Sequence, residues 1–225
     1  MIVDYDTRPS DAHFVEAVYQ ARSIGGGSFT STAASHWEMV ITKQKEKITF
    51  SIRGSETKAS PAPIPKDAEF LGIIFKHGMF MPNLPGSKLV DQEIHLPGSS
   101  RNSFQLFGDR WEFPTLENVD TFVNRLLRKE LLSHDQVVAD VLRGKTQDLS
   151  LRSIQRRFLH VTGLTYKAIQ QIERAHKAVA LLQSGVSVPE TTYQTGYFDQ
   201  AHLTNSLRRY YGQTPAQVSR LNLAE

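Results

Sequence analysis

The spacing of apolar residues changes once along this chain of 225 residues, and that change limits what the chain can fold into. Before about residue 115, apolar and polar residues alternate in short runs, which is the period of a strand with one face in solvent. After that point apolar residues recur every third or fourth position, as in a helix with one buried face. The pattern predicts an α+β chain: a β-rich domain over residues 1–115, a connecting helix over 116–132 and an all-α domain over 133–225.

The front part contains three clear strand patterns. "HWEMVIT" (36–42) and "KITFSIRG" (47–54) alternate in hydrophobicity, and a polar segment between them predicts a hairpin. "AEFLGIIFK" (68–76) is nearly continuous in apolar residues, as expected for a strand buried on both faces. Proline- and glycine-rich turns separate these runs, and short strands of this kind are typical of a small β-barrel or β-sandwich.

Residues that begin and end helices recur throughout the rear part. The connecting helix is expected to have Thr115 as its N-cap, and the longest helix is expected to run from Thr165 to about Gln183. Three further helices are expected to begin after a good N-cap residue: Ser150, Asp199 and Thr214. Five glycines lie where helices are expected to end: Gly144, Gly163, Gly185, Gly196 and Gly212.

The order of short helix, glycine-containing turn and basic helix occurs twice, which is the order of a helix-turn-helix. The second helix of such a unit presents polar side chains to the major groove, where base edges accept or donate hydrogen bonds. In the first candidate reading helix, the polar face carries Arg152, Gln155 and Arg156, opposite Ile154, Phe158 and Leu159. In the second, the polar face carries Gln200, His202, Asn205, Arg208 and Arg209, opposite Leu203, Leu207 and Tyr210.

The rear part resembles the DNA-binding domain of the AraC/XylS family of bacterial transcription regulators. The resemblance lies in "LSLRSIQRRFLHVTGLTYKAIQQIERAHKAVALLQ" and in "VSVPETTYQTGYFDQAHLTNSLRRYYGQTPAQV". It implies seven helices, with two helix-turn-helix units joined by a long helix. It also implies base contacts from Arg152, Gln155 and Arg156 in one unit, and from Gln200, Ala201, His202 and Asn205 in the other.

The sequence departs from the family pattern at two places. The turn over residues 140–149 is longer than the family's, which leaves open how the first unit is placed. Thr191 and Thr192 replace the family's Ile-Ala, which is expected to weaken apolar packing.

The front part resembles a cupin-like sensor domain, through "SHWEMV", "GIIFKHGMFMP" and "DRWEFP". This resemblance implies sensing or dimerisation and names no ligand. Large side chains such as Trp37, Phe80 and Trp111 fit either a ligand pocket or an ordinary core. No His-x-His occurs, and although His77 and His95 could converge, we predict no metal site and no cofactor.

Charge and composition separate the two parts and exclude some chemistry. Residues 1–143 carry 16 Lys and Arg against 18 Asp and Glu, whereas residues 144–225 carry 10 against 5, so the basic excess lies in the rear part. The chain has no cysteine, so disulfides and cysteine nucleophiles are excluded, and no catalytic constellation is present. The absence of a signal-like start and of a long apolar segment predicts a cytoplasmic protein with no membrane partner.

We therefore predict a sequence-specific, double-stranded DNA-binding transcription regulator that is not an enzyme. A small-molecule effector, a homodimer and, for an activator, RNA polymerase are left open as further partners. Two alternatives stay open: a cupin-like enzyme with a helical accessory domain, and a nonspecific architectural DNA binder. The long helix also predicts that one monomer reads two unlike sequence blocks about 10 base pairs apart.

Overall fold

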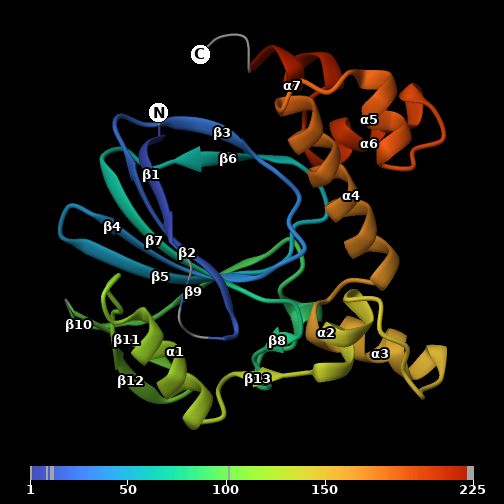
Figure 1. The fold of residues 1–225 in the computed structure, drawn as a ribbon. Coiled ribbons are helices and arrows are strands. Elements are labelled where there is room, and N and C mark those ends of the chain that lie inside the picture. Colours follow the sequence, from blue (N-terminus) through green and yellow to red (C-terminus); the bar gives the residue numbers. More distant parts are fainter. Residues whose placement is uncertain (1, 9, 11–12, 101, 222–225) are drawn as a thin grey trace. The chain divides into compact units, whose positions relative to one another are not determined.

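The alternating segments of the front part form an antiparallel sheet of six strands (Figure 1). The computed structural model, which describes residues 2–8, 10, 13–100 and 102–221, gives the strand order β1-β2-β7-β4-β5-β9. Along the chain these strands are β1 (Ile2–Arg8), β2 (Val15–Ser23), β4 (Glu38–Gln44), β5 (Lys47–Arg53), β7 (Ala68–Phe75) and β9 (Glu93–Leu96). The three strands predicted from the sequence are therefore confirmed as β4, β5 and β7.

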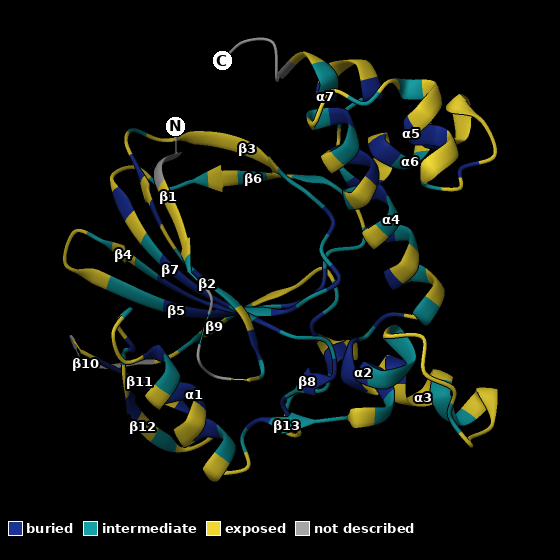
Figure 2. Cartoon of the chain, in the orientation of Figure 1, coloured by how far each residue is buried: buried dark blue, intermediate teal, exposed yellow. Residues whose placement is uncertain are grey.

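The front part contains three smaller sheets as well. Their strands are β10 (Gly98–Ser100), β11 (Ser103–Leu106) and β12 (Asp109–Glu112); β8 (Met79–Phe80) paired with β13 (Ser133–His134); and β3 (Gly27–Ser31) paired with β6 (Ser60–Ile64). The apolar positions of the strands form one core, closed by the apolar face of helix α1 (Val119–Arg128). Phe50 stacks on Phe104 within it, with 4.2 Å between ring centroids, and the buried positions follow the inner strands in Figure 2.

Tertiary contacts divide the chain into two compact units. Unit 1 comprises Met1–Ser28, His36–Ser55 and Pro63–Thr165, and unit 2 comprises Phe29–Ser35, Glu56–Ala62 and Tyr166–Glu225. Unit 1 therefore contains the six-stranded sheet together with helices α2 (Gln136–Leu142) and α3 (Leu151–Val161). Unit 2 contains α4 (Tyr166–Gln183), α5 (Val188–Gln194), α6 (Gln200–Tyr210) and α7 (Pro215–Leu221). The predicted α+β class and the predicted order of helices are confirmed, whereas the functional domain boundaries at 115 and 133 stay predictions.

Two details differ from the sequence prediction. The connecting helix begins at Val119, after the N-cap Asn118, because residues 115–118 form a turn in which the Thr115 N–H donates to Asn118 Oδ1 at 2.8 Å. The start of the segment predicted as all-α forms the short strand β13, since His134 and Ser133 pair with β8.

Two segments of the front part belong to unit 2, and we call them the early segments (residues 29–35 and 56–62). The Ala33 N–H donates to the Tyr210 carbonyl at 2.7 Å, and the Ala59 N–H donates to the Arg209 carbonyl at 2.8 Å. The His176 ring donates from Nε2 to the Ala33 carbonyl at 2.7 Å. Since the last carbonyls of a helix have no partner within the helix, the early segments satisfy two such groups at the end of α6.

Candidate nucleic-acid interface

The first candidate reading helix, α3, begins where the sequence predicted. Ser150 is its N-cap, and the Ser153 N–H donates to Ser150 Oγ at 3.2 Å. Arg152, Gln155 and Arg156 are exposed on this helix, as a reading face requires. Phe158 is fully buried, but Leu159 is 44% exposed, so the prediction that Leu159 packs on the buried face was wrong. Val161 takes that place instead, one turn after Phe158.

Helix α3 is fixed to the rest of unit 1 at two places. In the middle of the helix, Arg157 donates to Asp135, the N-cap of α2, at 2.6 Å, and so joins the two helices of the first helix-turn-helix. At the carboxyl end, Gly86 in the 3₁₀ helix η1 (Gly86–Lys88) meets the backbone that follows α3. A Cβ atom on Gly86 would lie 2.6 Å from Gly163 N, so only glycine permits this approach.

The lengthened turn over residues 140–149 folds back on the end of α2. Asp140 accepts hydrogen bonds from Arg143 at 2.6 Å and Gln136 at 2.9 Å, and it pairs with Lys145 at 3.1 Å. These groups, Arg143 first, lower the pKa of the Asp140 carboxyl below its usual value. Arg143 and Lys145, which directly follow α2, are thereby held at one carboxylate.

The second candidate reading helix, α6, begins after Asp199. The His202 N–H donates to Asp199 Oδ1 at 2.7 Å, which confirms the predicted N-cap. The six candidate reading residues of this helix are all exposed: Gln200, Ala201, His202, Asn205, Arg208 and Arg209. The opposite face is buried through Leu203, Leu207 and Tyr210, as predicted.

Buried aromatic residues hold α6 against its neighbours in unit 2. The hydroxyls of Tyr197 and Ser206 are 2.7 Å apart, and Arg174 lies over the Tyr197 ring at 5.1 Å. Burial raises the pKa of Tyr197, so its hydroxyl stays protonated. Tyr210 donates from its hydroxyl to Gln171 of α4 at 3.1 Å. The exposed face of α6 is therefore supported by a buried face that packs against other residues of unit 2.

The Thr191-Thr192 departure leaves one polar atom without a partner. Both threonines are buried on α5, and Thr192 donates from Oγ1 to the Val188 carbonyl at 2.7 Å. Thr191 Oγ1 is buried and finds no hydrogen-bond acceptor or donor in the described part of the chain. The departure thus places an unsatisfied hydroxyl at a buried position, and the weaker apolar packing stays a prediction.

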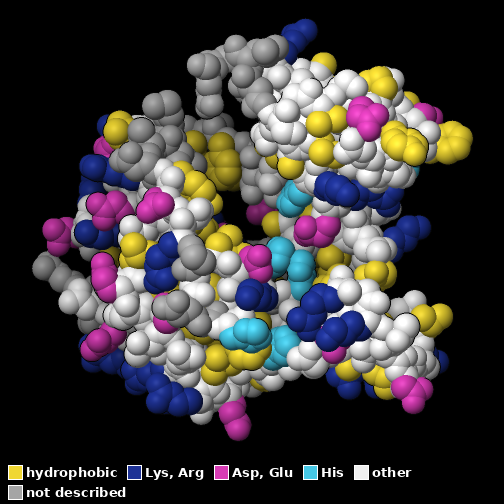
Figure 3. Space-filling model, in the orientation of Figure 1, with side chains coloured by type: hydrophobic (Ala, Val, Ile, Leu, Met, Phe, Trp, Pro, Cys, Tyr) yellow, Lys and Arg dark blue, Asp and Glu magenta, His cyan; other side chains and the backbone are white. Residues whose placement is uncertain are grey.

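The arginines of the two reading faces are available to an anionic partner. Within residues 2–8, 10, 13–100 and 102–221, Arg152, Arg156 and Arg208 form no ion pair with a carboxylate. Arg157, by contrast, is occupied by Asp135. On the face of the molecule drawn in Figure 3, Lys and Arg side chains gather over α2 and α3.

Most of the large apolar residues that fit either a ligand pocket or a core lie in the core, whereas Phe80 is only partly buried. Trp37, Phe75 and Trp111 are buried, and the space beside Trp37 and Phe80 is about 10 Å³, which holds one water molecule. A second cavity, of about 920 Å³, lies elsewhere in unit 1. It is lined by apolar side chains including Ile41, Ile48, Leu71 and Phe113, and by polar ones including Gln20, Arg110 and Arg125.

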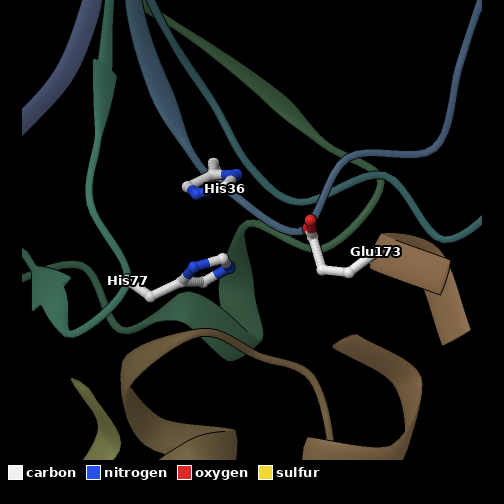
Figure 4. A group of neighbouring side chains, drawn as sticks. All are labelled: His36, His77 and Glu173. Atoms are coloured by element: carbon white, nitrogen blue, oxygen red, sulfur yellow. The ribbon is translucent and has the colours of Figure 1, made fainter. Parts of the chain in front are cut away.

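The histidine pair considered from the sequence is not the one that the structure describes. His95 lies 2.9 Å from Ser51 Oγ, measured from Nδ1, whereas the His77 ring lies against His36 with 3.8 Å between centroids (Figure 4). The segments before β4 and after β7 bring these two rings together, and no sequence motif marks them. Within unit 1 the pair supplies two imidazoles, which are possible metal ligands, and the absence of a metal site stays a prediction.

Comparison with known proteins supports the helix-turn-helix assignment. Residues 145–220 match the family model described as a helix-turn-helix domain. The HTH-type transcriptional regulator GlxA of Rhizobium meliloti (strain 1021) is 27% identical over 106 residues, which are 47% of this chain and 29% of GlxA. The chain therefore corresponds to well under two thirds of the length of that relative. The family match confirms a helix-turn-helix domain over residues 145–220, as the sequence predicted.

Two solved structures of ToxT from Vibrio cholerae show a low overall similarity. An apo variant from strain SCE256 gives a TM-score of 0.41 at 7% identity, covering 90% of this chain and 96% of ToxT. ToxT from strain O395, bound to (E)-4-(8-methylnaphthalen-1-yl)but-3-enoic acid, gives a TM-score of 0.40 at 10% identity, covering 98% of this chain and 100% of ToxT.

No helix in the described residues is long and apolar enough to cross a membrane.

Proposed function

We propose that this chain is a transcription regulator that binds double-stranded DNA in a sequence-specific manner through α3 and α6. The observation that carries the proposal is the presence of two N-capped helices, each with an exposed polar face, within the segment that matches a helix-turn-helix domain. A protein that is similar to this chain over 106 residues is a transcription regulator by name.

Each reading face has the side chains that discriminate base pairs. Arg152 and Arg156 can donate two parallel hydrogen bonds to guanine, and Gln155 can pair with adenine. On α6, Gln200 and Asn205 can pair with adenine in the same manner, while Ala201 can contact a thymine methyl group. Arg208 and Arg209, near the end of α6, suit phosphate contacts that position the helix.

Selection of binding sites from a random duplex library, followed by affinity measurements at a fixed salt concentration, tests the proposal. A specific regulator is expected to bind its selected site at least about 10³ times more tightly than random duplex. Equal affinity for both would indicate a nonspecific architectural binder instead.

Arg156→Ala and Arg157→Ala form a matched pair for this test. The Arg156→Ala variant is expected to lose about 1–3 kcal/mol of binding free energy and to relax base preference at one position. The Arg157→Ala variant removes a cation of equal charge that is engaged with Asp135, so it is expected to keep the base preference at every position. Identical binding profiles for the two variants would contradict the role of Arg156.

We further propose that the cavity of about 920 Å³ binds a small-molecule effector. Its size lies within the range of ligand sites, and its apolar lining combined with a few charged groups is typical of them. Leu71, a nearly buried lining residue, offers a way to fill the site. A metabolite that raises the melting temperature of the native chain, but not that of a Leu71→Trp variant with unchanged DNA affinity, would identify the effector.

The remaining parts of the proposal concern assembly and location. We propose a cytoplasmic protein without enzymatic activity, which forms a homodimer and, if it activates transcription, contacts RNA polymerase. Sedimentation with and without the selected site tests the homodimer. Transcription from a promoter that carries the site, assayed with purified polymerase, tests the contact. Turnover of a small molecule by the purified chain would favour the alternative of a cupin-like enzyme.

A further inference from the structure

Three of the most exposed large apolar side chains in the described residues lie in the two helix-turn-helix units. Phe198 is 92% exposed, Tyr193 is 82% exposed and Leu151 is 78% exposed. Figure 3 shows hydrophobic side chains protruding from the surface over α5 and α6. A single exposed apolar residue needs no explanation, but the repeated position of two of these residues does.

Leu151 and Phe198 both lie at the amino end of a candidate reading helix. Leu151 is the first residue of α3, directly after its N-cap Ser150, and Phe198 directly precedes Asp199, the N-cap of α6. The amino end of a reading helix is the end that contacts base edges in a helix-turn-helix. Tyr193 lies on α5, the other helix of the second unit, and does not share this position.

The backbone around each residue is fixed by neighbouring side chains. Ser150 and Asp199 each accept a hydrogen bond from the first turn of their helix, at 3.2 and 2.7 Å. On the other side of Phe198, Tyr197 is buried and bonded to Ser206. Phe198 therefore lies between two anchored residues, with its side chain exposed to solvent.

The polar surroundings of both residues fit duplex DNA. Arg152 and Gln155 follow Leu151 on α3, and Gln200 follows Phe198 by two positions. Such a group of arginine, amide and apolar side chains is complementary to the major groove. Phosphates line the rims of that groove, and base edges form its floor. The one apolar group on that floor is the C5-methyl of thymine.

We propose that Leu151 and Phe198 determine specificity by contacting thymine C5-methyl groups, one in each of the two sequence blocks. This inference rests on the proposed DNA binding and adds two residues that read by apolar contact. Deoxyuridine differs from thymidine by that methyl group alone, so it isolates the contact without changing any hydrogen bond.

The experiment replaces each thymidine of the selected site with deoxyuridine, one at a time, and measures the affinity of the full chain. The native chain is expected to lose roughly fourfold in affinity at one position or more in each block, the effect of one buried methyl group. Leu151→Ala is expected to abolish the effect in the block read by α3, and Phe198→Ala the effect in the block read by α6. The Tyr193→Ala variant is the matched control, and its deoxyuridine profile is expected to equal that of the native chain.

The outcomes separate this inference from the function on which it rests. Specific binding with no deoxyuridine effect, or with effects that persist in both alanine variants, would overturn the methyl contacts and leave the regulator proposal standing. In that case the exposed side chains would serve another partner. Failure to select any specific site would overturn the proposed function, and the methyl contacts with it.

Discussion

At the scale of single residues, Thr191 is one position where a buried polar group lowers the stability of the fold. Its buried hydroxyl has no partner in the described residues, whereas that of the adjacent Thr192 is bonded to the Val188 carbonyl. Thr191→Val keeps the shape and removes the unsatisfied group, so it is expected to raise the free energy of unfolding by about 1 kcal/mol. Thr192→Val is the control and is expected to give no gain, because it removes a bonded hydroxyl. Urea unfolding of both variants checks this, and equal effects would contradict it.

Residues whose role is set by local sequence were predictable. Ser150 and Asp199 were recognised as N-caps because a cap depends on the following three residues alone. Leu159 and Thr115 were misassigned, since the exposed side of α3 and the turn before α1 depend on tertiary packing. The His36–His77 contact was missed for the same reason: it joins two segments that no local pattern relates.

At the scale of elements, the contact between η1 and the end of α3 depends on a glycine. A Cβ atom on Gly86 would lie 2.6 Å from backbone atoms of residues 161–163, which cannot yield as a side chain can. Gly86→Ala is therefore expected to cost about 1–3 kcal/mol of stability and to weaken recognition of the block read by α3. Gly27→Ala is the matched control, because nothing lies within 4 Å of its added carbon, and a change within about 0.5 kcal/mol is expected. Calorimetry and binding profiles check both; a tolerated Gly86→Ala would show that the contact is loose.

The early segments are the element that sequence reasoning did not assign. Residues 29–31 form an exposed strand without apolar alternation, and its role comes from backbone groups, which sequence patterns do not encode. Because the basic excess lies in the rear part, we expect residues 133–225 alone to bind DNA. Such a fragment lacks Ala33 and Ala59, so the Tyr210 and Arg209 carbonyls at the end of α6 lose the N–H groups that donate to them in the full chain.

The loss of these two hydrogen bonds is measurable by amide hydrogen exchange. In a fragment of residues 133–225, amides of the last turn of α6 are expected to exchange hydrogen faster than in the full chain, because the turn frays once its partners are gone. Affinity for the selected site is expected to fall as well. Amides at the start of α6, where Asp199 still caps the helix, serve as the internal control. Equal protection of the last turn in fragment and full chain would show that the early segments contribute nothing to it.

At the scale of the whole molecule, the two candidate reading faces have different sequences, so a monomer that binds DNA through both is expected to prefer a site that is not palindromic. Helix α4 has 18 residues and spans roughly 27 Å at about 1.5 Å per residue. We expect two unlike blocks about 10 base pairs apart, one altered by Arg156→Ala and the other by Asn205→Ala. Inserting about five base pairs between the blocks is expected to weaken binding, since it rotates one block to the opposite side of the duplex. The same insertion outside both blocks is the control, and equal affinities for the two would contradict the two-block site.

The early segments also determine the order in which unit 2 can fold during synthesis of the chain. The chain is synthesised from its amino end, so residues 29–35 and 56–62 leave the ribosome long before α4 to α7 exist. The Ala33 carbonyl cannot accept its hydrogen bond from His176 until that residue, 143 positions later, has been synthesised. Contacts at such separation slow folding, because a long loop must close before they form. Unit 2 is thus completed only after α7 has been synthesised, and a chain that terminates before α4 carries the early segments without the helices they contact.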